Sequence, residues 1–288
     1  MPKLYVVATP IGNLSELSPR AADTLREADL ILAEDTRVTH KLLAHIGARV
    51  PMQAHHRHNE HEQSEALVRR MIEEELTVAL VSDAGTPGIS DPGAALVRAA
   101  AAAGIDVQPI AGPSAAAAAL SICGFMGAEY AFLGFPPRQA GDRERFLQKA
   151  ATLGIPIIIV YESPHRVTAL VESIARTLPQ AVLCVCCDLT KRHELTLRGA
   201  PEAVGEALRA NPNTAKGEYV AVLDVSACQR EAPARVTVSA EALLLDALLG
   251  GVSMQEAIAS AMSSGVSRND AYRASIAIKK LELPLFVK

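Results

Sequence analysis

Residues 83–93 read Asp-Ala-Gly-Thr-Pro-Gly-Ile-Ser-Asp-Pro-Gly and directly follow the apolar run Thr77–Val81. That run predicts a strand, and the three glycines and two prolines after it predict a rigid loop that leads into a helix over residues 94–103. Open α/β sheets bind ligands at the carboxyl ends of their strands. Glycines let a ligand approach the backbone, and prolines fix the path of the loop. A tight surface turn is the alternative, but the density of these residues favours a ligand-binding loop.

Strand and helix patterns alternate on both sides of this loop. Before and after it we expect strands at residues 3–8, 30–33 and 107–110, and helices at residues 19–28, 38–46, 62–75 and 115–122. Such alternation is typical of a mostly parallel sheet covered by helices. The first part of the chain therefore predicts an α/β domain over residues 1–114.

A second round of the same pattern begins near Glu129. It predicts strands at residues 130–133, 155–161, 181–188 and 219–225, and helices at residues 143–152, 166–178 and 201–209. We expect a second α/β domain over residues 115–228, followed by a linker at residues 229–238 that contains Pro233 and mixed charge. The fold class is α/β, with two α/β domains and a small helical domain at residues 239–288.

The last part of the chain has a helical period. We expect three helices, at residues 240–249, 254–264 and 268–281. Ser253 with Glu256 fits a capping box, and Ser267 with Asp270 fits its acidic variant. Gly265 lies where the second of these helices must end. Three short helices of this kind resemble a helix-turn-helix module.

From Arg268 to the last residue, five basic residues stand against two acidic ones, opposite in sign to the chain as a whole. A small structural bundle is one interpretation of these helices. Because of the reversed charge we favour RNA binding by Arg268, Arg273 and Lys279.

Composition limits the class of protein and its compartment. The 288 residues are 49% hydrophobic and 21% charged, which predicts folded units rather than disorder. The net charge of -4 gives no global basic field, so nucleic acid would be held by local patches. Neither a signal-type segment nor an apolar run of about 18 residues is evident. We expect a cytoplasmic protein that does not contact a membrane.

The five cysteines, an odd number, do not predict a disulfide framework. In the expected strand at residues 181–188, alternation places Cys184 and Cys186 on one face and Cys187 on the other. We interpret these thiols as small apolar fillers, with metal binding as the alternative.

Four histidines, His55, His56, His58 and His61, fall within residues 53–61. A metal site is one interpretation. However, no cysteine lies nearby, and one short loop can rarely aim four imidazoles at one ion. We therefore favour a solvated or substrate-facing loop and expect no metal.

Five motifs carry a family resemblance. They are residues 8–14 (Ala-Thr-Pro-Ile-Gly-Asn-Leu), 34–37 (Glu-Asp-Thr-Arg), 82–93, 134–138 (Gly-Phe-Pro-Pro-Arg) and 161–166 (Tyr-Glu-Ser-Pro-His-Arg). In this combination and order the chain resembles the ribosomal RNA small-subunit methyltransferase I family of the tetrapyrrole-methylase superfamily. The match runs from Lys3 to about Val225, and the terminal helices are also expected in this family. At residues 187–191, Cys-Asp-Leu-Thr-Lys replaces the frequent Arg-Glu-Leu-Thr-Lys but retains Thr190 and Lys191.

The resemblance implies a reaction and its partners. The methyl donor would be S-adenosylmethionine, bound without a metal in a cleft between the two α/β domains. The acceptor would be the ribose 2′-hydroxyl of a decoding-centre cytidine in 16S rRNA, within the 30S ribosomal subunit. The resemblance also implies a homodimer.

On this basis we predict a donor site and a proton acceptor. The expected donor-binding residues are Pro10, Gly85, Thr86, Pro87, Ile89, Ser114, Ala115, Gly217 and Glu218. Methyl transfer is an in-line displacement, so the protein must mainly hold the reacting atoms in position. A ribose hydroxyl is a poor nucleophile, and a group that takes its proton would help. Lys191 is our first candidate, provided that desolvation lowers its pKa, and Glu162 is the second.

Basic residues at strand ends predict an RNA surface. Arg37, Arg138, Arg166 and Arg192 each follow a predicted strand, as does His165. Guanidinium groups suit phosphates, so we expect this set to bind RNA.

Two other functions fit the same residues. One is methylation of a tetrapyrrole or another small molecule, because a fold does not settle a function. The other is a non-catalytic RNA-binding assembly factor with an inactive donor pocket. The arginines at the strand ends favour RNA over a small molecule, and binding of S-adenosylmethionine would separate an enzyme from an assembly factor.

Overall fold

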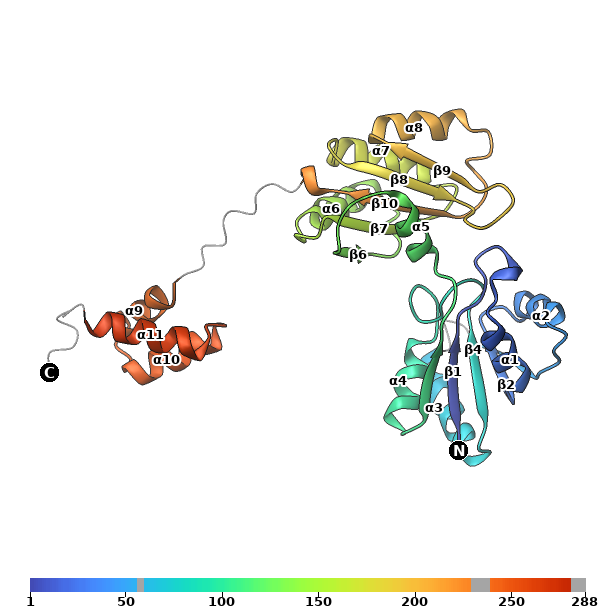
Figure 1. Ribbon diagram of the computed structural model, residues 1–288, viewed down its shortest axis with the longest axis horizontal. Helices are drawn as coiled ribbons and strands as arrows, with labels where there is room; N and C mark the ends of the chain where they lie inside the picture. Colours follow the sequence, from blue (N-terminus) through green and yellow to red (C-terminus); the bar gives the residue numbers. More distant parts are fainter. Residues whose placement is uncertain (56–59, 229–238, 281–288) are drawn as a thin grey trace. The chain divides into compact units, whose positions relative to one another are not determined.

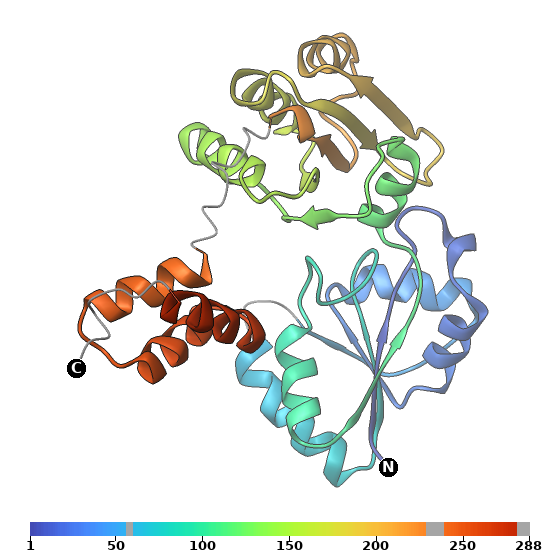
Figure 2. The same cartoon turned by 60° about the vertical axis from the view of Figure 1, so that its left-hand side comes forward.

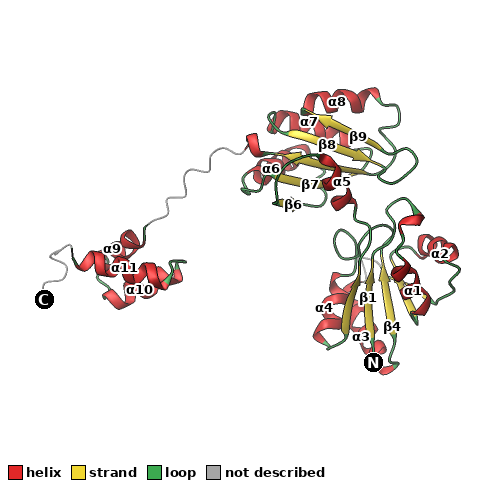
Figure 3. Ribbon diagram, viewed as in Figure 1, coloured by secondary structure: helices red, strands yellow, loops and turns green. Residues whose placement is uncertain are grey.

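The computed structural model describes residues 1–55, 60–228 and 239–280 (Figure 1). The chain divides into two compact units, Met1–Gln229 and Arg230–Lys288. The first unit contains two five-stranded sheets, and the described part of the second is helical (Figure 3). We call the first of these sheets, with the helices that cover it, the first lobe, and the second sheet, with its helices, the second lobe.

The sheet of the first lobe is entirely parallel, in the order β3-β2-β4-β1-β5. Its strands are β1 (Lys3–Val7), β2 (Leu30–Ala33), β3 (Met52–Ala54), β4 (Thr77–Val81) and β5 (Asp106–Ile110). The helices are α1 (Pro19–Glu27), α2 (Thr36–His45), α3 (Glu60–Glu73) and α4 (Ala94–Ala102), with a short 3-10 helix at Leu14–Glu16. The expected parallel sheet is confirmed. Because the strands are parallel, the loops after β1, β2, β4 and β5 meet at one edge of the sheet.

Helices cover both faces of this sheet (Figure 2). Successive side chains of a strand point to opposite faces. In β4, Leu80 packs with α3 and α4, whereas its neighbours Ala79 and Val81 pack with α1 and α2. The continuous apolar character of β4 is therefore required, since both of its faces are buried.

The sheet of the second lobe is mixed, in the order β6-β7-β10-β8-β9. Its strands are β6 (Tyr130–Phe132), β7 (Ile157–Glu162), β8 (Val182–Cys187), β9 (Leu195–Gly199) and β10 (Tyr219–Asp224). β6 and β7 are parallel, whereas β10 is antiparallel to β7 and β8, and β9 is antiparallel to β8. The amino end of β10 therefore lies beside the carboxyl ends of β7 and β8.

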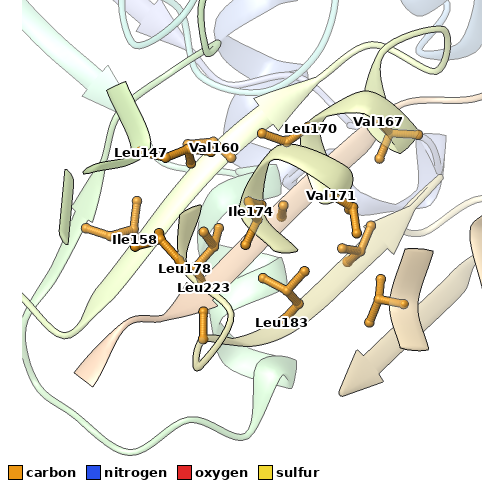
Figure 4. Packing of buried hydrophobic residues seen from close by; sticks show 14 of the residues in the cluster. Leu147, Ile158, Val160, Val167, Leu170, Val171, Ile174, Leu178, Leu183 and Leu223 are labelled. Atoms are coloured by element: carbon orange, nitrogen blue, oxygen red, sulfur yellow. The ribbon is translucent and has the colours of Figure 1, made fainter. Parts of the chain in front are cut away.

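Three helices cover one face of the second sheet and one covers the other. They are α6 (Ala140–Ala151), α7 (Val167–Thr177) and α8 (Pro201–Ala210) on one side, and α5 (Ala115–Cys123) on the other, with a 3-10 helix at Ser226–Cys228. Figure 4 shows Ile174 of α7 packed among the strand residues Leu183 and Leu223. All three of these side chains are fully or almost fully buried.

The cysteines of β8 lie as the alternation predicts. Cys184 and Cys186 belong to the apolar cluster under α5, and Cys187 belongs to the cluster on the opposite face. The Cys184 and Cys186 sulfurs are 3.9 Å apart within that buried cluster. Their surroundings support the interpretation as small apolar fillers.

The second unit is built from α9 (Ala240–Leu249), α10 (Met254–Ser263) and α11 (Arg268–Lys279). All three helices were predicted. The capping box between Ser253 and Glu256 is present, Ser267 caps α11 through the Asp270 N–H, and Gly265 has a φ of 93° just after α10. Along the described residues no helix is both long and apolar enough to cross a bilayer.

Two strands were not predicted. β3 has three residues, none of them β-branched, and pairs only with β2. β9 alternates apolar and polar residues in Leu195-Thr196-Leu197-Arg198, but this short pattern follows a polar turn directly. The helices α2, α3 and α6 begin two or three residues earlier than predicted, because their first turns are polar and show no apolar period.

Candidate functional site

A cavity of about 430 Å³ opens where the loops of the first lobe meet the second lobe. Small-molecule sites typically have volumes of roughly 300–1,000 Å³. From the first lobe it is lined by Ile11, Glu34 and residues 83–86 and 89–91. From the second lobe and the segment before α5 it is lined by Ser114, Ala115, Phe135, Leu189 and residues 161–164 and 218–220.

The glycine-rich loop after β4 forms one wall of the cavity and is fixed to the loop after β1. The Thr9 N–H donates to the Gly85 carbonyl at 2.9 Å, and the Gly85 N–H donates to the Thr9 carbonyl at 3.0 Å. The Thr9 hydroxyl donates to the Ser82 carbonyl at 3.1 Å. Gly85 and Gly88 have φ values of 81° and 80°, which side chains strongly disfavour. The loop path therefore requires glycine at these positions.

β10 supplies part of the opposite wall. Tyr219, its first residue, pairs with Glu162 of β7 on one side and with Cys187 of β8 on the other. This register carries Glu218 and Tyr219 to the cavity, although they are distant in sequence from the glycine-rich loop.

Tyr161 links α5 to the aromatic part of the cavity. The Ala116 N–H, in the first turn of α5, donates to the Tyr161 hydroxyl at 3.1 Å. Phe132 and Phe135 meet the Tyr161 ring edge to face, with centroids 4.7 Å and 5.7 Å away. Burial raises the pKa of the Tyr161 phenol, although the hydrogen bond from Ala116 acts in the opposite direction.

Glu162 is a buried carboxylate at the cavity. Its Oε1 accepts a hydrogen bond from the Ser163 N–H at 2.8 Å, and its Oε2 lies 3.0 Å from Nη2 of Arg166. Burial raises the pKa of Glu162, although Ser163 and Arg166 act in the opposite direction. A carboxylate with a raised pKa is a stronger base than an exposed one.

Lys191 lies in the turn after β8. Its Nζ donates to Asp188 Oδ1 at 2.7 Å and to Glu218 Oε2 at 2.9 Å. Burial alone would lower the pKa of Lys191, but the two carboxylates outweigh it and the net pKa is raised. We expected Lys191 to act as a base on the condition that its pKa is lowered. That condition is not met, because the two carboxylates stabilise the charged ammonium.

The turn that carries Lys191 also contacts the first lobe. A β-carbon added at Gly12 would lie 2.5 Å from Lys191 Cγ and 2.9 Å from both Leu189 O and Thr190 Oγ1. Thr190 has a φ of 67°, a strained conformation for a β-branched residue. The absence of a side chain at Gly12 is what allows the two lobes to approach here.

The charged side chains that line the cavity are all acidic. Five of its lining residues are acidic: Glu34, Asp83, Asp91, Glu162 and Glu218. Within the described residues, none of the lining side chains is a lysine or an arginine. Two of these carboxylates pair with cations outside the lining, Glu162 with Arg166 and Glu218 with Lys191. The lining itself suits a cationic ligand better than a phosphate.

The family is identified by sequence. The profile of the family described as Tetrapyrrole (Corrin/Porphyrin) Methylases matches residues 3–204. The chain is 40% identical over 277 residues to the ribosomal RNA small subunit methyltransferase I of Escherichia coli O157:H7, covering 94% of this chain and 93% of that protein. The chain belongs to the ribosomal RNA small subunit methyltransferase I family.

Other comparisons agree with this assignment. The protein of the same name from Pseudomonas aeruginosa is 40% identical over 282 residues, which cover 95% of this methyltransferase and 96% of that one. Uroporphyrin-III C-methyl transferase from Thermus thermophilus, solved in complex with S-adenyl homocysteine, superposes with a TM-score of 0.54 at 18% identity. The superposition covers 77% of this chain and 97% of that chain. This similarity confirms the predicted fold class.

Most residues expected to bind a donor in this methyltransferase lie around the cavity. Gly85, Thr86, Ile89, Ser114, Ala115 and Glu218 line it. Pro10, Pro87 and Gly217 are not among the lining residues. Gly217 lies behind Glu218, where a β-carbon would be 2.6 Å from Asp188 Oδ2. Its φ of 87° also requires glycine, so it shapes the wall without facing the cavity.

The predicted RNA-binding residues differ in whether their side chains are exposed to solvent or bound to other parts of the protein. Arg138, His165 and Arg192 are exposed, and Arg37 is 89% exposed while it pairs with Asp35. The Arg37 guanidinium also lowers the pKa of Asp35 to about 2. Arg166 differs, because its Nη2 donates to the Pro136 carbonyl at 2.6 Å and pairs with Glu162. In the second unit, Arg268, Arg273 and Lys279 are exposed on α11.

The histidine loop does not match the expectation in the part that is described. His55 is 1% exposed, and its backbone N–H donates to the Ala33 carbonyl at the end of β2. The prediction of a solvated or substrate-facing residue is wrong for His55. His56 and His58 lie outside the described residues, as does the side chain of His61. Among the residues that are described, no cluster of three potential metal ligands is present.

Several cavity residues were not predicted. Glu34, Phe135 and Tyr161 all lie inside the quoted motifs, and Glu34 and Phe135 also follow a strand, so these signals could have indicated them. Tyr219 was not predicted, although the resemblance indicated its neighbours Gly217 and Glu218; the antiparallel direction of β10 brings it to the cavity.

Proposed function

We propose that this protein transfers the methyl group of S-adenosylmethionine to the ribose 2′-hydroxyl of a decoding-centre cytidine in 16S rRNA. The observation that carries the proposal is the cavity between the lobes, in a chain that is 40% identical to named ribosomal RNA small subunit methyltransferases over nearly its whole length. We further propose that it acts in the cytoplasm on the 30S subunit and as a homodimer.

The cavity fits the donor in size and charge. S-adenosylmethionine carries a positive sulfonium, a positive ammonium and one carboxylate, and the acidic lining of the cavity favours its two cationic groups. Gly85 and Thr86 would present backbone groups to the polar parts of the donor, while Ile89 and Ala115 would give apolar cover. When bound, the donor supplies a methyl group that the sulfonium activates toward an oxygen nucleophile. No metal is required for this reaction.

The acceptor hydroxyl must lose a proton as the new C–O bond forms and the C–S bond breaks. Glu162 is the better candidate for this proton, because it lines the cavity and its pKa is raised. Lys191 would instead stay charged and hold Glu218 in place. This order reverses our prediction from the sequence.

RNA would be held outside the cavity, where the acidic lining does not repel its phosphates. Arg138 and Arg192 follow β6 and β8, and both are exposed at the edge of the second sheet nearest the cavity. Arg37 follows β2 at the corresponding edge of the first sheet. Arginines at such positions suit phosphate contacts that fix the register of the RNA.

The decisive experiment is methyl transfer from labelled S-adenosylmethionine. Purified protein would be incubated with 30S particles, naked 16S rRNA and a corrinoid precursor in parallel, and the modified ribose would be mapped. We expect label in 30S particles at one cytidine 2′-oxygen. Label in the corrinoid alone would indicate a small-molecule methylase, and absence of donor binding by calorimetry would indicate an assembly factor. Light scattering would test the homodimer.

A further inference from the structure

Aromatic residues are scarce in this chain, yet they gather at the cavity. The sequence has five tyrosines, five phenylalanines and no tryptophan. Three of these ten, Phe135, Tyr161 and Tyr219, line the cavity. Tyr219 is buried and Tyr161 is only partly exposed, whereas Phe135 is 56% exposed. The Phe135 ring is therefore accessible to a ligand at the cavity.

The loop that carries Phe135 is held rigidly. Gly134 has a φ of 65°, and its carbonyl accepts a hydrogen bond from the Tyr161 N–H at 2.9 Å. On the other side of Phe135, Arg166 Nη2 donates to the Pro136 carbonyl at 2.6 Å, and Pro136 itself is buried. The backbone is therefore fixed on both sides of the exposed ring.

The ring itself is also supported from one side. Phe135 and Tyr161 meet at an interplanar angle of 69°, with centroids 5.7 Å apart. Tyr161 is in turn fixed by Ala116 and Phe132. An edge-to-face contact of this kind uses only part of the aromatic surface. The phenyl group of Phe135 thus remains available to a flat ligand while its orientation is set by the protein.

We propose that Phe135 is the stacking surface for the nucleobase of the methylated nucleotide, which leaves the RNA stack to bring its ribose to the cavity. This inference rests on the proposed function. A neutral base can approach the five carboxylates of the cavity, whereas a phosphate is repelled by them. Single-stranded bases commonly stack on aromatic side chains, because every base has a flat face. Arg138, three residues further along the same rigid loop, is exposed and would contact the neighbouring phosphate.

Phe135→Ala, Phe135→Leu, Phe135→Trp and Tyr130→Ala test the proposal. Tyr130 is a matched control, because it is an aromatic residue of the same lobe, is 54% exposed and does not line the cavity. Methyl transfer to 30S particles gives kcat/KM, calorimetry gives the Kd for S-adenosylmethionine, and thermal unfolding confirms that each variant is folded.

We expect Phe135→Ala and Phe135→Leu to lower kcat/KM for 30S particles by between about 5-fold and about 150-fold, the range of base stacking on an aromatic ring. Phe135→Trp and Tyr130→Ala should stay close to the wild type, and the donor Kd should be unchanged in every variant. Wild-type-like kcat/KM in Phe135→Ala or Phe135→Leu would overturn the inference. A weaker donor Kd of matching size would also overturn it and would assign Phe135 to the donor instead. A wild-type protein that methylates no 30S particle would refute the proposed function itself.

Discussion

The Lys191 ammonium donates a hydrogen bond to the Glu218 carboxylate, with Nζ 2.9 Å from Oε2. This ion pair joins the turn after β8 to a residue that lines the cavity. Because Asp188 is the second partner of the same ammonium, Lys191 fixes two carboxylates at once. The side chain is thus suited to holding the cavity wall in place.

Lys191→Met should therefore destabilise the fold, by about 1 kcal/mol for a partly exposed ion pair. The raised pKa of Lys191 means that its contribution is complete below the ordinary lysine pKa and is lost only as the pH rises through the higher folded value. The loss measured by urea unfolding should accordingly be the same at pH 6 and pH 9. Lys191→Arg, which keeps the charge, should retain most of the methyl transfer. Complete inactivity of a folded Lys191→Arg would instead support Lys191 as the proton acceptor.

Glu162→Gln should lower kcat by roughly 10²- to 10⁴-fold, the range for loss of a general base. The acidic limb of the pH–rate profile should vanish with it, because the raised pKa of Glu162 is assigned to that limb. The donor Kd is measured in parallel, and we expect it to change much less than kcat. An acidic limb that persists in the variant would exclude Glu162 from this role.

The stability of Glu162→Gln should also have a distinctive pH dependence. Because the pKa of Glu162 is raised in the folded state, the native protein binds the Glu162 proton more tightly than the unfolded chain does. The wild type therefore loses stability as the pH rises from the ordinary glutamate pKa through the raised folded value. The difference in free energy of unfolding should therefore shift in favour of the variant as the pH increases. Thermal unfolding at several pH values measures this shift.

Most of the fold could be predicted because its signals are local. Runs such as Thr77–Val81 are apolar and β-branched, and the glycines after them mark where each strand ends. β3 was not predicted, because the sequence of a three-residue edge strand is too short to be distinguished from a loop. The buried position of His55 follows directly from that missed strand, since its N–H continues the contact with β2.

The site was predictable only where it lies in loops that follow strands. Gly85 and Thr86 were found because they belong to one continuous Gly/Pro segment. Glu218 was predicted only through the family resemblance, and its neighbour Tyr219 was not predicted, because the strand direction that brings both to the cavity is a tertiary property. The charge state of Lys191 was also inaccessible, since it depends on the distances to Asp188 and Glu218 rather than on spacing in the sequence.

Gly12→Ala should weaken the contact between the lobes. The added β-carbon would lie 2.5 Å from Lys191 Cγ and 2.9 Å from the Leu189 carbonyl, so the turn must shift. We expect a loss of about 1–3 kcal/mol in urea unfolding and a weaker donor Kd. Gly141→Ala is the control, because a β-carbon there meets nothing within 4 Å in helix α6. It should change the stability little, because Gly141 lies in the first turn of α6. Equal effects of the two substitutions would contradict the close contact at Gly12.

Arg138→Ala and Arg166→Ala should fail in different ways, although both arginines were predicted to bind RNA. The Arg138 side chain is exposed. Its removal should therefore weaken RNA binding and reduce the slope of log K against log salt by about 1. Arg166 holds the Pro136 carbonyl and pairs with the buried Glu162. Its removal should cost about 2 kcal/mol of stability, because these acceptors lose a charged donor.

Filter binding at several salt concentrations, together with urea unfolding, separates the two effects. Arg138→Ala should unfold like the wild type, whereas Arg166→Ala should unfold at lower urea and show a smaller change in salt slope for the folded fraction. Lys149→Ala, on α6 and away from the cavity lining, provides a control for the loss of one surface charge. A salt slope that falls equally in Arg138→Ala and Lys149→Ala would mean that the effect reflects net charge. In that case the loop after β6 would not be a phosphate contact.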